Sequence, residues 1–263
     1  MPDVIDEHFY RSAGEMQEAA IQLDNYDRGG PKIFVGEWAT REGEPTTNFN
    51  TAPGDAAWMT GMERNSDIIL MHCYAPLFVN VGKGAMQWPG SLIGFDALTS
   101  YGSPSYYAQK MFSHYSGDKV LTVKGINIPV QNWQPPAPKG KEKSPVRELN
   151  PLYYSITRDS KTGCIYLKIV NTAATGQSVH IDVNGVRVAA EGTLVVLASV
   201  DPKATNSIDA PTTITPKTSR LDSLGNTFMH TLASYSINVL QLNTTSHQPA
   251  VGASATTVGI TGN

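Results

Sequence analysis

The stretch Lys32-Ile33-Phe34-Val35-Gly36-Glu37-Trp38-Ala39 decides how the rest of the chain is interpreted. Its consecutive apolar residues, two of them β-branched, predict a buried strand. The strand runs into Gly36, where backbone can pass close to another group, and then presents a carboxylate beside an indole. A carboxylate at the end of a buried strand is costly unless it is paired or used in chemistry. On this stretch alone, a salt-bridged structural Glu37 is the favoured interpretation.

Similar apolar runs on either side change that balance. Strand centres near Val4, Phe34 and Ile69 are about 30 to 35 residues apart with a helical segment in each gap, which is the spacing of right-handed βαβ units. Polar and aromatic residues follow each run: His8 and Tyr10, Glu37 and Trp38, His72 and Tyr74. The carboxyl ends of parallel strands form the rim where such folds hold their active sites. Three successive strands that deliver such groups to one rim favour a functional Glu37.

The connections between these strands predict three helices and one long loop. Ser12 is a suitable N-cap for the first helix, which Gly29-Gly30-Pro31 ends. The second helix spans roughly 55–65, and Ser103-Pro104 begins the third. The long connection 75–103 lies at the rim, where loops of this length are usually functional.

The second half of the chain has a different composition. The Pro-rich segment 129–145 carries a lysine cluster and predicts an exposed loop. After Asn150, short β-branched runs alternate with turn residues, and Asn184-Gly185 predicts a two-residue hairpin. This pattern is typical of a β-sandwich or jelly-roll. The tail 246–263 has few residues to bury and is expected to be disordered.

Charge and composition exclude several classes of function. The net charge of −3 over 263 residues provides no basic stripe, so no nucleic acid is expected as partner. No apolar run approaches the length of a membrane span, and no export signal is visible at residues 1–6. Cys73 and Cys164 fit neither a metal-ligand spacing nor a disulfide framework, which predicts two isolated buried thiols.

Gly36-Glu37-Trp38-Ala39, taken with four other segments, resembles the α-L-arabinofuranosidases of glycoside hydrolase family 51. The other segments are Asp6-Glu7-His8-Phe9-Tyr10, Gly61-Met62-Glu63-Arg64-Asn65-Ser66-Asp67, Tyr74-Ala75-Pro76-Leu77-Phe78 and Tyr101-Gly102-Ser103-Pro104-Ser105-Tyr106-Tyr107. The resemblance implies an α/β plus all-β fold. Residues 1–118 would be the C-terminal three βα units of a (β/α)8 catalytic barrel, and residues 119–245 a jelly-roll-like β-sandwich domain that includes the loop 129–145.

The resemblance also implies an activity and a set of site residues. The family's retaining hydrolases release terminal non-reducing α-L-arabinofuranosyl groups from arabinoxylan, arabinan or arabino-oligosaccharides, without a metal or other cofactor. Glu37 matches the nucleophile at the end of the seventh barrel strand. The substrate-binding positions implied are His8 and Tyr10 on the sixth strand, Trp38 beside the nucleophile, and Gln87 with Trp88 in a loop after the eighth strand.

One departure from the family pattern concerns the second catalytic carboxyl group. The family's general acid/base is the glutamate of an Asn-Glu pair on the fourth strand, and no Asn-Glu pair occurs in this sequence. We therefore expect a C-terminal piece of a longer parent, inactive in isolation, with the parent's compartment and oligomerisation left open. Its three strands would leave one apolar face, including Ile33, Val35, Ile69 and Met71, without the packed interior of a closed barrel. Glu42, Glu44 and Glu63 fall in a loop or on a helix and are expected to be solvated or ion-paired.

Two alternative functions remain at this point. A non-catalytic sugar-binding module would use the sandwich and Trp133, and it would need a row of exposed aromatics such as Tyr153, Tyr154 and Tyr166. A degenerate hydrolase retained as an interaction partner is the other alternative. The intact Glu37 with its His-x-Tyr neighbourhood argues against the second.

Overall fold

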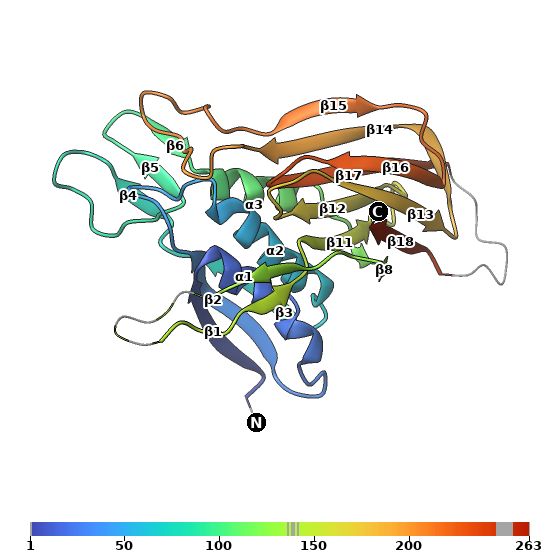
Figure 1. Ribbon diagram of the computed structural model, residues 1–263, viewed down its shortest axis with the longest axis horizontal. Coiled ribbons are helices and arrows are strands. Elements are labelled where there is room, and N and C mark those ends of the chain that lie inside the picture. The colour runs from blue at the N-terminus through green and yellow to red at the C-terminus, as the bar shows by residue number, and fades with distance from the viewer. Residues whose placement is uncertain (1, 136, 138–139, 141, 246–254, 263) are drawn as a thin grey trace.

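The computed structural model describes residues 2–135, 137, 140, 142–245 and 255–262. A small parallel sheet at the N-terminal end and a larger β-sandwich lie on opposite sides of a layer of helices (Figure 1). This arrangement confirms the expected α/β plus all-β fold class.

The parallel sheet has the strand order β1-β2-β3. Its strands are β1 (Val4–Arg11), β2 (Lys32–Thr40) and β3 (Ile69–Tyr74), and both pairings are parallel. The strands coincide with the three apolar runs, and the connections between them contain helices, so the predicted βαβ units are confirmed.

The helices begin where the sequence places their caps. Ser12 caps α1 (Ala13–Ala19) through a capping box with Glu15, and Ser103 caps α3 (Pro104–His114). The first helix is shorter than expected, because the chain tightens into a 3-10 turn, η1 (Gln22–Asn25), well before the Gly-Gly-Pro segment. The predicted apolar stripe is nevertheless buried: Met16, Ala19, Ala20 and Leu23.

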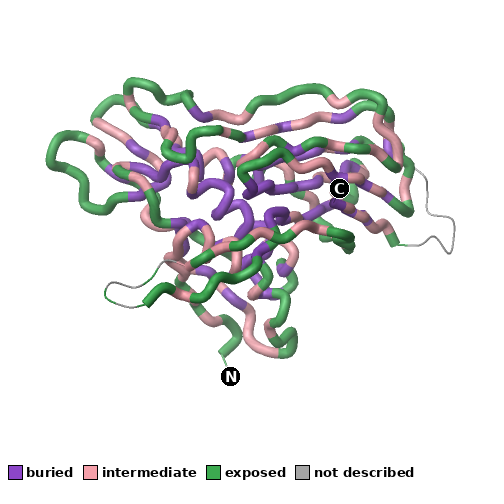
Figure 2. The backbone as a smooth tube through the Cα atoms, in the orientation of Figure 1, coloured by how far each residue is buried: buried purple, intermediate pink, exposed green. Residues whose placement is uncertain are grey.

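The central helix α2 (Thr51–Arg64) is enclosed on several sides. Every residue from Thr51 to Met62 is buried, because the helix contacts β2 on one side and sandwich strands on another. The core around α2 also includes sandwich residues such as Val170, Val195 and Val239. Figure 2 shows this buried backbone continuing from the helices into the sandwich. The barrel portion and the sandwich therefore share one core.

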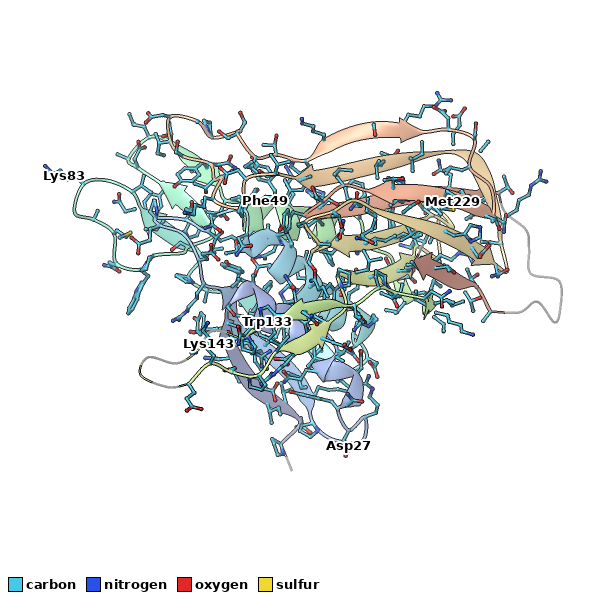
Figure 3. All side chains as sticks on the ribbon, viewed as in Figure 1. Asp27, Phe49, Lys83, Trp133, Lys143 and Met229 are labelled. Carbon is cyan, nitrogen blue, oxygen red and sulfur yellow. The ribbon has the colours of Figure 1, made fainter. Side chains whose placement is uncertain are left out.

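The rim connection 75–103 is more ordered than a simple loop. It contains a small three-stranded sheet made of β4 (Phe78–Asn80), β5 (Ile93–Phe95) and β6 (Ser100–Gly102). This sheet projects to the left in Figure 1, and Lys83 marks the outer part of its β4–β5 loop in Figure 3.

The sandwich consists of two sheets, with strand orders β15-β14-β17-β12-β11-β7 and β16-β13-β18-β8. The strands are β7 (Lys119–Val120), β8 (Thr122–Ile126), β11 (Leu152–Arg158), β12 (Ile165–Asn171), β13 (Gln177–Asn184), β14 (Arg187–Ala198), β15 (Lys217–Leu221), β16 (Thr227–Leu232), β17 (Ser236–Thr245) and β18 (Thr257–Gly262). Apolar side chains from the two sheets form a second core cluster between them.

Two predictions about the sandwich are wrong. Asn184-Gly185 does not close a hairpin, because β13 and β14 belong to different sheets and the turn carries the chain from one sheet to the other. The tail was expected to be disordered, yet β18 pairs with β13 and β8, and it buries Val258 and Ile260. Residues 246–254 and 263 of the predicted tail lie outside the described residues.

Part of the Pro-rich segment is also a strand. β9 (Gln131–Trp133) pairs with β10 (Arg147–Leu149), so the segment 129–145 is not wholly an exposed loop. The Trp133 indole, labelled in Figure 3, packs against α1: a Cβ on Gly14 would lie 2.2 Å from its Nε1 atom. This packing gives Trp133 a structural role.

The uncovered face of the parallel sheet is smaller than expected. Ile33, Val35, Ile69 and Met71 were expected to lack cover; the first three are buried, whereas Met71 is 59% exposed, as expected. Leu70 is also exposed, and it lies with Met71 on β3, an edge strand of the sheet.

Two further features concern cysteines and membranes. Cys164 is buried, as expected, whereas Cys73 is exposed on β3, so the prediction of two buried thiols is half wrong. Within the described residues, the helices are too short or too polar to cross a membrane.

Candidate active site

A β-bulge in β2 sets the position of Glu37. Between Val35 and Trp38, two residues of β2 lie opposite a single residue of β3, and the pairing with β1 shifts at the same place. Bulges of this kind redirect side chains and are frequent beside active sites. Because the bulge breaks the alternation of the strand, the Trp38 side chain is buried while Glu37 stays partly exposed.

The bulge brings Gly36 against Asp6 on β1. The Gly36 N–H donates to Asp6 Oδ1 over 3.0 Å, and a Cβ at Gly36 would lie 2.2 Å from that oxygen. Only glycine fits this close approach. The second oxygen of Asp6 lies 3.0 Å from His8 Nε2, which leaves His8 Nδ1 3.6 Å from Glu37 Oε2. Asp6 therefore orients the imidazole beside Glu37.

Tyr10 supplies the shortest contact to Glu37. Its hydroxyl donates to Glu37 Oε2 over 2.5 Å. Burial and the bond to Glu37 raise the pKa of the Tyr10 hydroxyl, so it remains a proton donor at neutral pH. The Arg41 guanidinium lies over the Tyr10 ring, 3.8 Å from its centre, in a cation–π contact. Among the described residues, Glu37 Oε1 has no hydrogen-bond partner, so this oxygen is available to a ligand.

Glu37 opens into a cavity of about 680 Å³. This volume lies within the ordinary range of small-molecule sites. The cavity is lined by Tyr10, Glu37, Arg41, Glu42, Gly43, Glu44, Ala75, Pro76, Trp88, Pro89 and Gly90. These residues come from the carboxyl ends of β1 and β2, from the loops that follow β2 and β3, and from the β4–β5 loop, as expected for a site at this rim.

The structure brings together four of the residues predicted from sequence. His8 and Tyr10 each lie against Glu37, although His8 is not among the residues that line the cavity, and Trp88 lies on the cavity wall with 67% of its surface exposed. The prediction for Trp38 needs correction: its indole is fully buried and contributes no wall to the cavity.

Trp38 and Gln87 lie outside the cavity for different reasons. Trp38 Nε1 donates to His72 Nδ1 over 3.2 Å, and the indole packs edge-on against Tyr74, which ties β2 to β3 in the core. Gln87 is exposed in the projecting loop and is not among the lining residues.

Sequence reasoning missed several groups at the site. Asp6 shares one strand face with His8 at a spacing of two residues, and this pattern was its only signal. Glu42 and Glu44 are exposed, as expected of solvated side chains, and in addition both line the cavity. Glu63 is ion-paired with the buried Lys168, as expected, and lies away from Glu37.

Other kinds of site find little support. In the part of the chain that the structure describes, no group of three or more His, Cys, Asp or Glu side chains is arranged to hold a metal ion. The aromatics considered for a separate sugar-binding face are used in packing: Tyr153 is buried in the shared core, and Trp133 lies against α1.

Known proteins resemble this chain over most of its length. Residues 36–236 match the family model described as the α-L-arabinofuranosidase C-terminal domain. A probable α-L-arabinofuranosidase A from Aspergillus terreus is 32% identical over 241 residues, which are 91% of this chain and 34% of the relative. An extracellular exo-α-L-arabinofuranosidase from Streptomyces chartreusis is 38% identical over 127 residues, which are 48% of this chain and 15% of the relative. The chain thus spans about a third or less of these relatives.

Solved structures give the same picture. An arabinose-bound MgGH51 α-L-arabinofuranosidase superposes with a TM-score of 0.76 and 28% identity, over 93% of this chain and 38% of that chain. An α-L-arabinofuranosidase from Thermotoga maritima in an arabinose complex has a TM-score of 0.69 and 16% identity, over 92% of this chain and 52% of that chain, and shows a shared fold.

Proposed function

Because the chain belongs to the α-L-arabinofuranosidases of glycoside hydrolase family 51 and matches their C-terminal portion, we propose that it carries the nucleophile of a retaining hydrolase. The parent enzyme would release terminal non-reducing α-L-arabinofuranosyl groups from arabinoxylan, arabinan or arabino-oligosaccharides. The observation that carries this proposal is the Glu37 carboxylate, which faces an open cavity with Tyr10 bonded to one oxygen and the other oxygen free.

The proposed reaction is a double displacement. The free oxygen of Glu37 attacks the anomeric carbon, the bond to the leaving oxygen breaks, and a glycosyl–enzyme ester forms. Water then cleaves that ester and releases arabinose. Tyr10 holds the carboxylate in place for attack, and its hydroxyl stabilises the charge that returns to Glu37 when the ester is cleaved.

The leaving oxygen needs a proton from a second carboxyl group, which we propose lies upstream of this sequence. Glu42 is a poor candidate for this acid, because each of its carboxylate oxygens accepts a hydrogen bond from a side-chain amide. That environment suits a charged acceptor, whereas a general acid must carry a proton. Loss of acid–base help typically lowers the rate by about 10²–10⁴-fold.

The nucleophile assignment is tested in a version extended to full length. Glu37→Gln should abolish hydrolysis of an aryl α-L-arabinofuranoside while arabinose still binds, since the amide keeps the shape of the side chain and loses its nucleophilicity. Glu148→Gln, an exposed glutamate on β10, is the matched control and should leave turnover unchanged. A fully active Glu37→Gln enzyme would place the nucleophile elsewhere.

The 263-residue chain itself is expected to be inactive and to aggregate. Among the described strands, β3 pairs with a neighbour on one side only. Two adjacent residues on this strand, Leu70 and Met71, are 52% and 59% exposed. A free sheet edge with uncovered apolar side chains favours association. Light scattering and an aryl-glycoside assay on the purified chain, with and without the proposed upstream barrel segment added in trans, test this expectation. Turnover by the monodisperse chain alone would show that it supplies its own acid.

A further inference from the structure

The Glu42 carboxylate is held in a fixed position on the cavity wall. Asn48 Nδ2 donates to Oε1 over 3.1 Å, and Asn50 Nδ2 donates to Oε2 over 2.6 Å. The Asn48 N–H also donates to the Glu42 carbonyl, which closes the loop on itself. Each carboxylate oxygen has capacity for a further hydrogen bond after accepting one amide. Glu42 is therefore a preorganised double acceptor that faces the cavity.

The sandwich supports the loop that carries Glu42. The Phe49 and Asn50 N–H groups donate to Ala204 and Pro202 carbonyls, each over 2.8 Å. The Thr205 hydroxyl donates to the Thr47 carbonyl over 2.9 Å. Phe49, labelled in Figure 3, lies at this junction and is buried in the shared core. A polar group on a loop braced in this way loses little further freedom when it binds a ligand.

Trp88 belongs to a second loop that is tied to the first. The Gly90 N–H donates to the Pro45 carbonyl over 3.0 Å, and the Thr47 N–H donates to the Ser91 carbonyl over 3.2 Å. The Trp88 ring nevertheless remains 67% exposed on the cavity wall. An exposed indole on an anchored loop beside a cavity contributes little to the core and is suited to ligand contact.

The charge of the cavity wall restricts the ligand. The lining includes the carboxylates of Glu37, Glu42 and Glu44 and one guanidinium, Arg41, so three negative charges against one positive give −2. Arg41 already stacks on the Tyr10 ring. A ligand with its own carboxylate would be repelled, whereas a neutral sugar presents hydroxyl donors to Glu42 and a C–H face to the indole.

We propose that Glu42 and Trp88 form a subsite for the neutral sugar unit that carries the arabinofuranosyl group. Both residues line the cavity into which Glu37 opens, and neither is bonded to Glu37. In the proposed reaction Glu37 faces the arabinofuranosyl ring, so we place the next sugar unit against these two loops. This assignment of sides rests on the proposed function. Glu42 accepts hydroxyls of that unit, Trp88 packs against its ring, and uronic acid units are excluded by charge.

The test uses xylobiose, a neutral disaccharide without arabinose, and glucuronosyl-xylose as its acidic counterpart. Binding to the dilute chain is followed by tryptophan fluorescence, because Trp38 and Trp58 are fully buried, Trp133 packs against α1, and Trp88 is the most exposed of the four indoles. We expect xylobiose to shield Trp88 from a neutral quencher and to bind at least about tenfold more tightly than the acidic sugar.

Variants separate this subsite from the nucleophile. Glu42→Gln should weaken xylobiose binding about tenfold, because it removes charge-assisted hydrogen bonds. It should also reduce the difference in affinity between xylobiose and the acidic sugar, because it removes a negative charge. Asn50→Ala keeps the Glu42 carboxylate but removes one of the hydrogen bonds that fix it, so it should weaken xylobiose binding less than Glu42→Gln does. Trp88→Ala should abolish binding, measured by calorimetry. Glu148→Gln, the exposed control, should bind xylobiose as the unaltered chain does.

The outcomes are distinct from those for the nucleophile. Unchanged binding by both Glu42→Gln and Trp88→Ala, equal binding of the two sugars, or no xylobiose binding by the unaltered chain would each overturn the subsite. Turnover that survives Glu37→Gln would overturn the proposed function and leave these binding results standing.

Discussion

Asp55 makes the stability of the fold depend on pH. It lies in the first turns of α2 and is fully buried. Its Oδ1 accepts the Thr40 N–H over 3.0 Å at the point where β2 leads into the cavity loop. Its Oδ2 has no hydrogen-bond partner among the described residues. Burial raises the pKa of this carboxyl from 3.8 to about 7.

The sign of the effect follows from that shift. The folded chain binds the proton more tightly than the unfolded chain, so ionisation of Asp55 costs stability once pH exceeds the unfolded value of 3.8. The free energy of unfolding should fall as pH rises between about 4 and 7 and then level off. The difference between a pKa of about 7 and one of 3.8 corresponds to about 4 kcal/mol.

Asp55→Asn should remove this dependence. The amide oxygen can still accept the Thr40 N–H, and no charge is buried at any pH. We expect the variant to be more stable by about 4 kcal/mol at about pH 8 and to match the unaltered chain at about pH 4. Urea unfolding at the two pH values measures the difference, with the exposed Asp209→Asn as control. An equal gain at both pH values, or none at the higher one, would refute the reasoning.

Three further variants probe individual contacts. Gly36→Ala should displace Asp6 and lower turnover of the extended enzyme, because the new Cβ would lie 2.2 Å from Asp6 Oδ1; a fully active variant would contradict the close approach. Lys168→Met should destabilise the chain by about 3–5 kcal/mol in urea, since it leaves Glu63 without its ion pair, and Lys168→Met combined with Glu63→Leu should recover most of that loss. Asn206→Ala should lower the urea midpoint by an amount equivalent to about 3 kcal/mol, because it removes bonds to the Gly102 and Ile214 backbone; an unchanged midpoint would show that water replaces them.

The sequence was informative where the signal is local. The strand Lys32–Thr40 and its neighbours follow from consecutive apolar residues, and the helix starts at Ser12 and Ser103 follow from their capping hydroxyls. Glu37 and Tyr10 were found because a motif orders them along the chain, and the parallel register then places them in contact. Such features depend on a few residues and survive in any context that buries the same face.

The errors arose where distant parts of the chain decide the outcome. The direction of the Trp38 side chain depends on the bulge, which is visible only against the registers of both neighbouring strands. The strand Thr257–Gly262 has alternating Val258 and Ile260, but it is short and Gly-rich. It forms because it pairs with β13 on one side and with β8 on the other. Asn184-Gly185 has the composition of a hairpin turn, yet the two strands that it joins find better partners in opposite sheets.

The packing around the cavity explains why the change in composition near residue 118 does not divide the molecule into independent halves. The loop that follows β2 carries Glu42, and carbonyls of the β14–β15 connection, at Pro202 and Ala204, accept its backbone N–H groups. Asn206 in the same connection donates to the Gly102 carbonyl at the end of β6. A sandwich that braces both loops at the mouth of the cavity positions groups that the parallel sheet alone would leave mobile. Its contribution to the proposed hydrolase is therefore mechanical support of the binding groups, and loss of that connection should affect binding before it affects the position of Glu37.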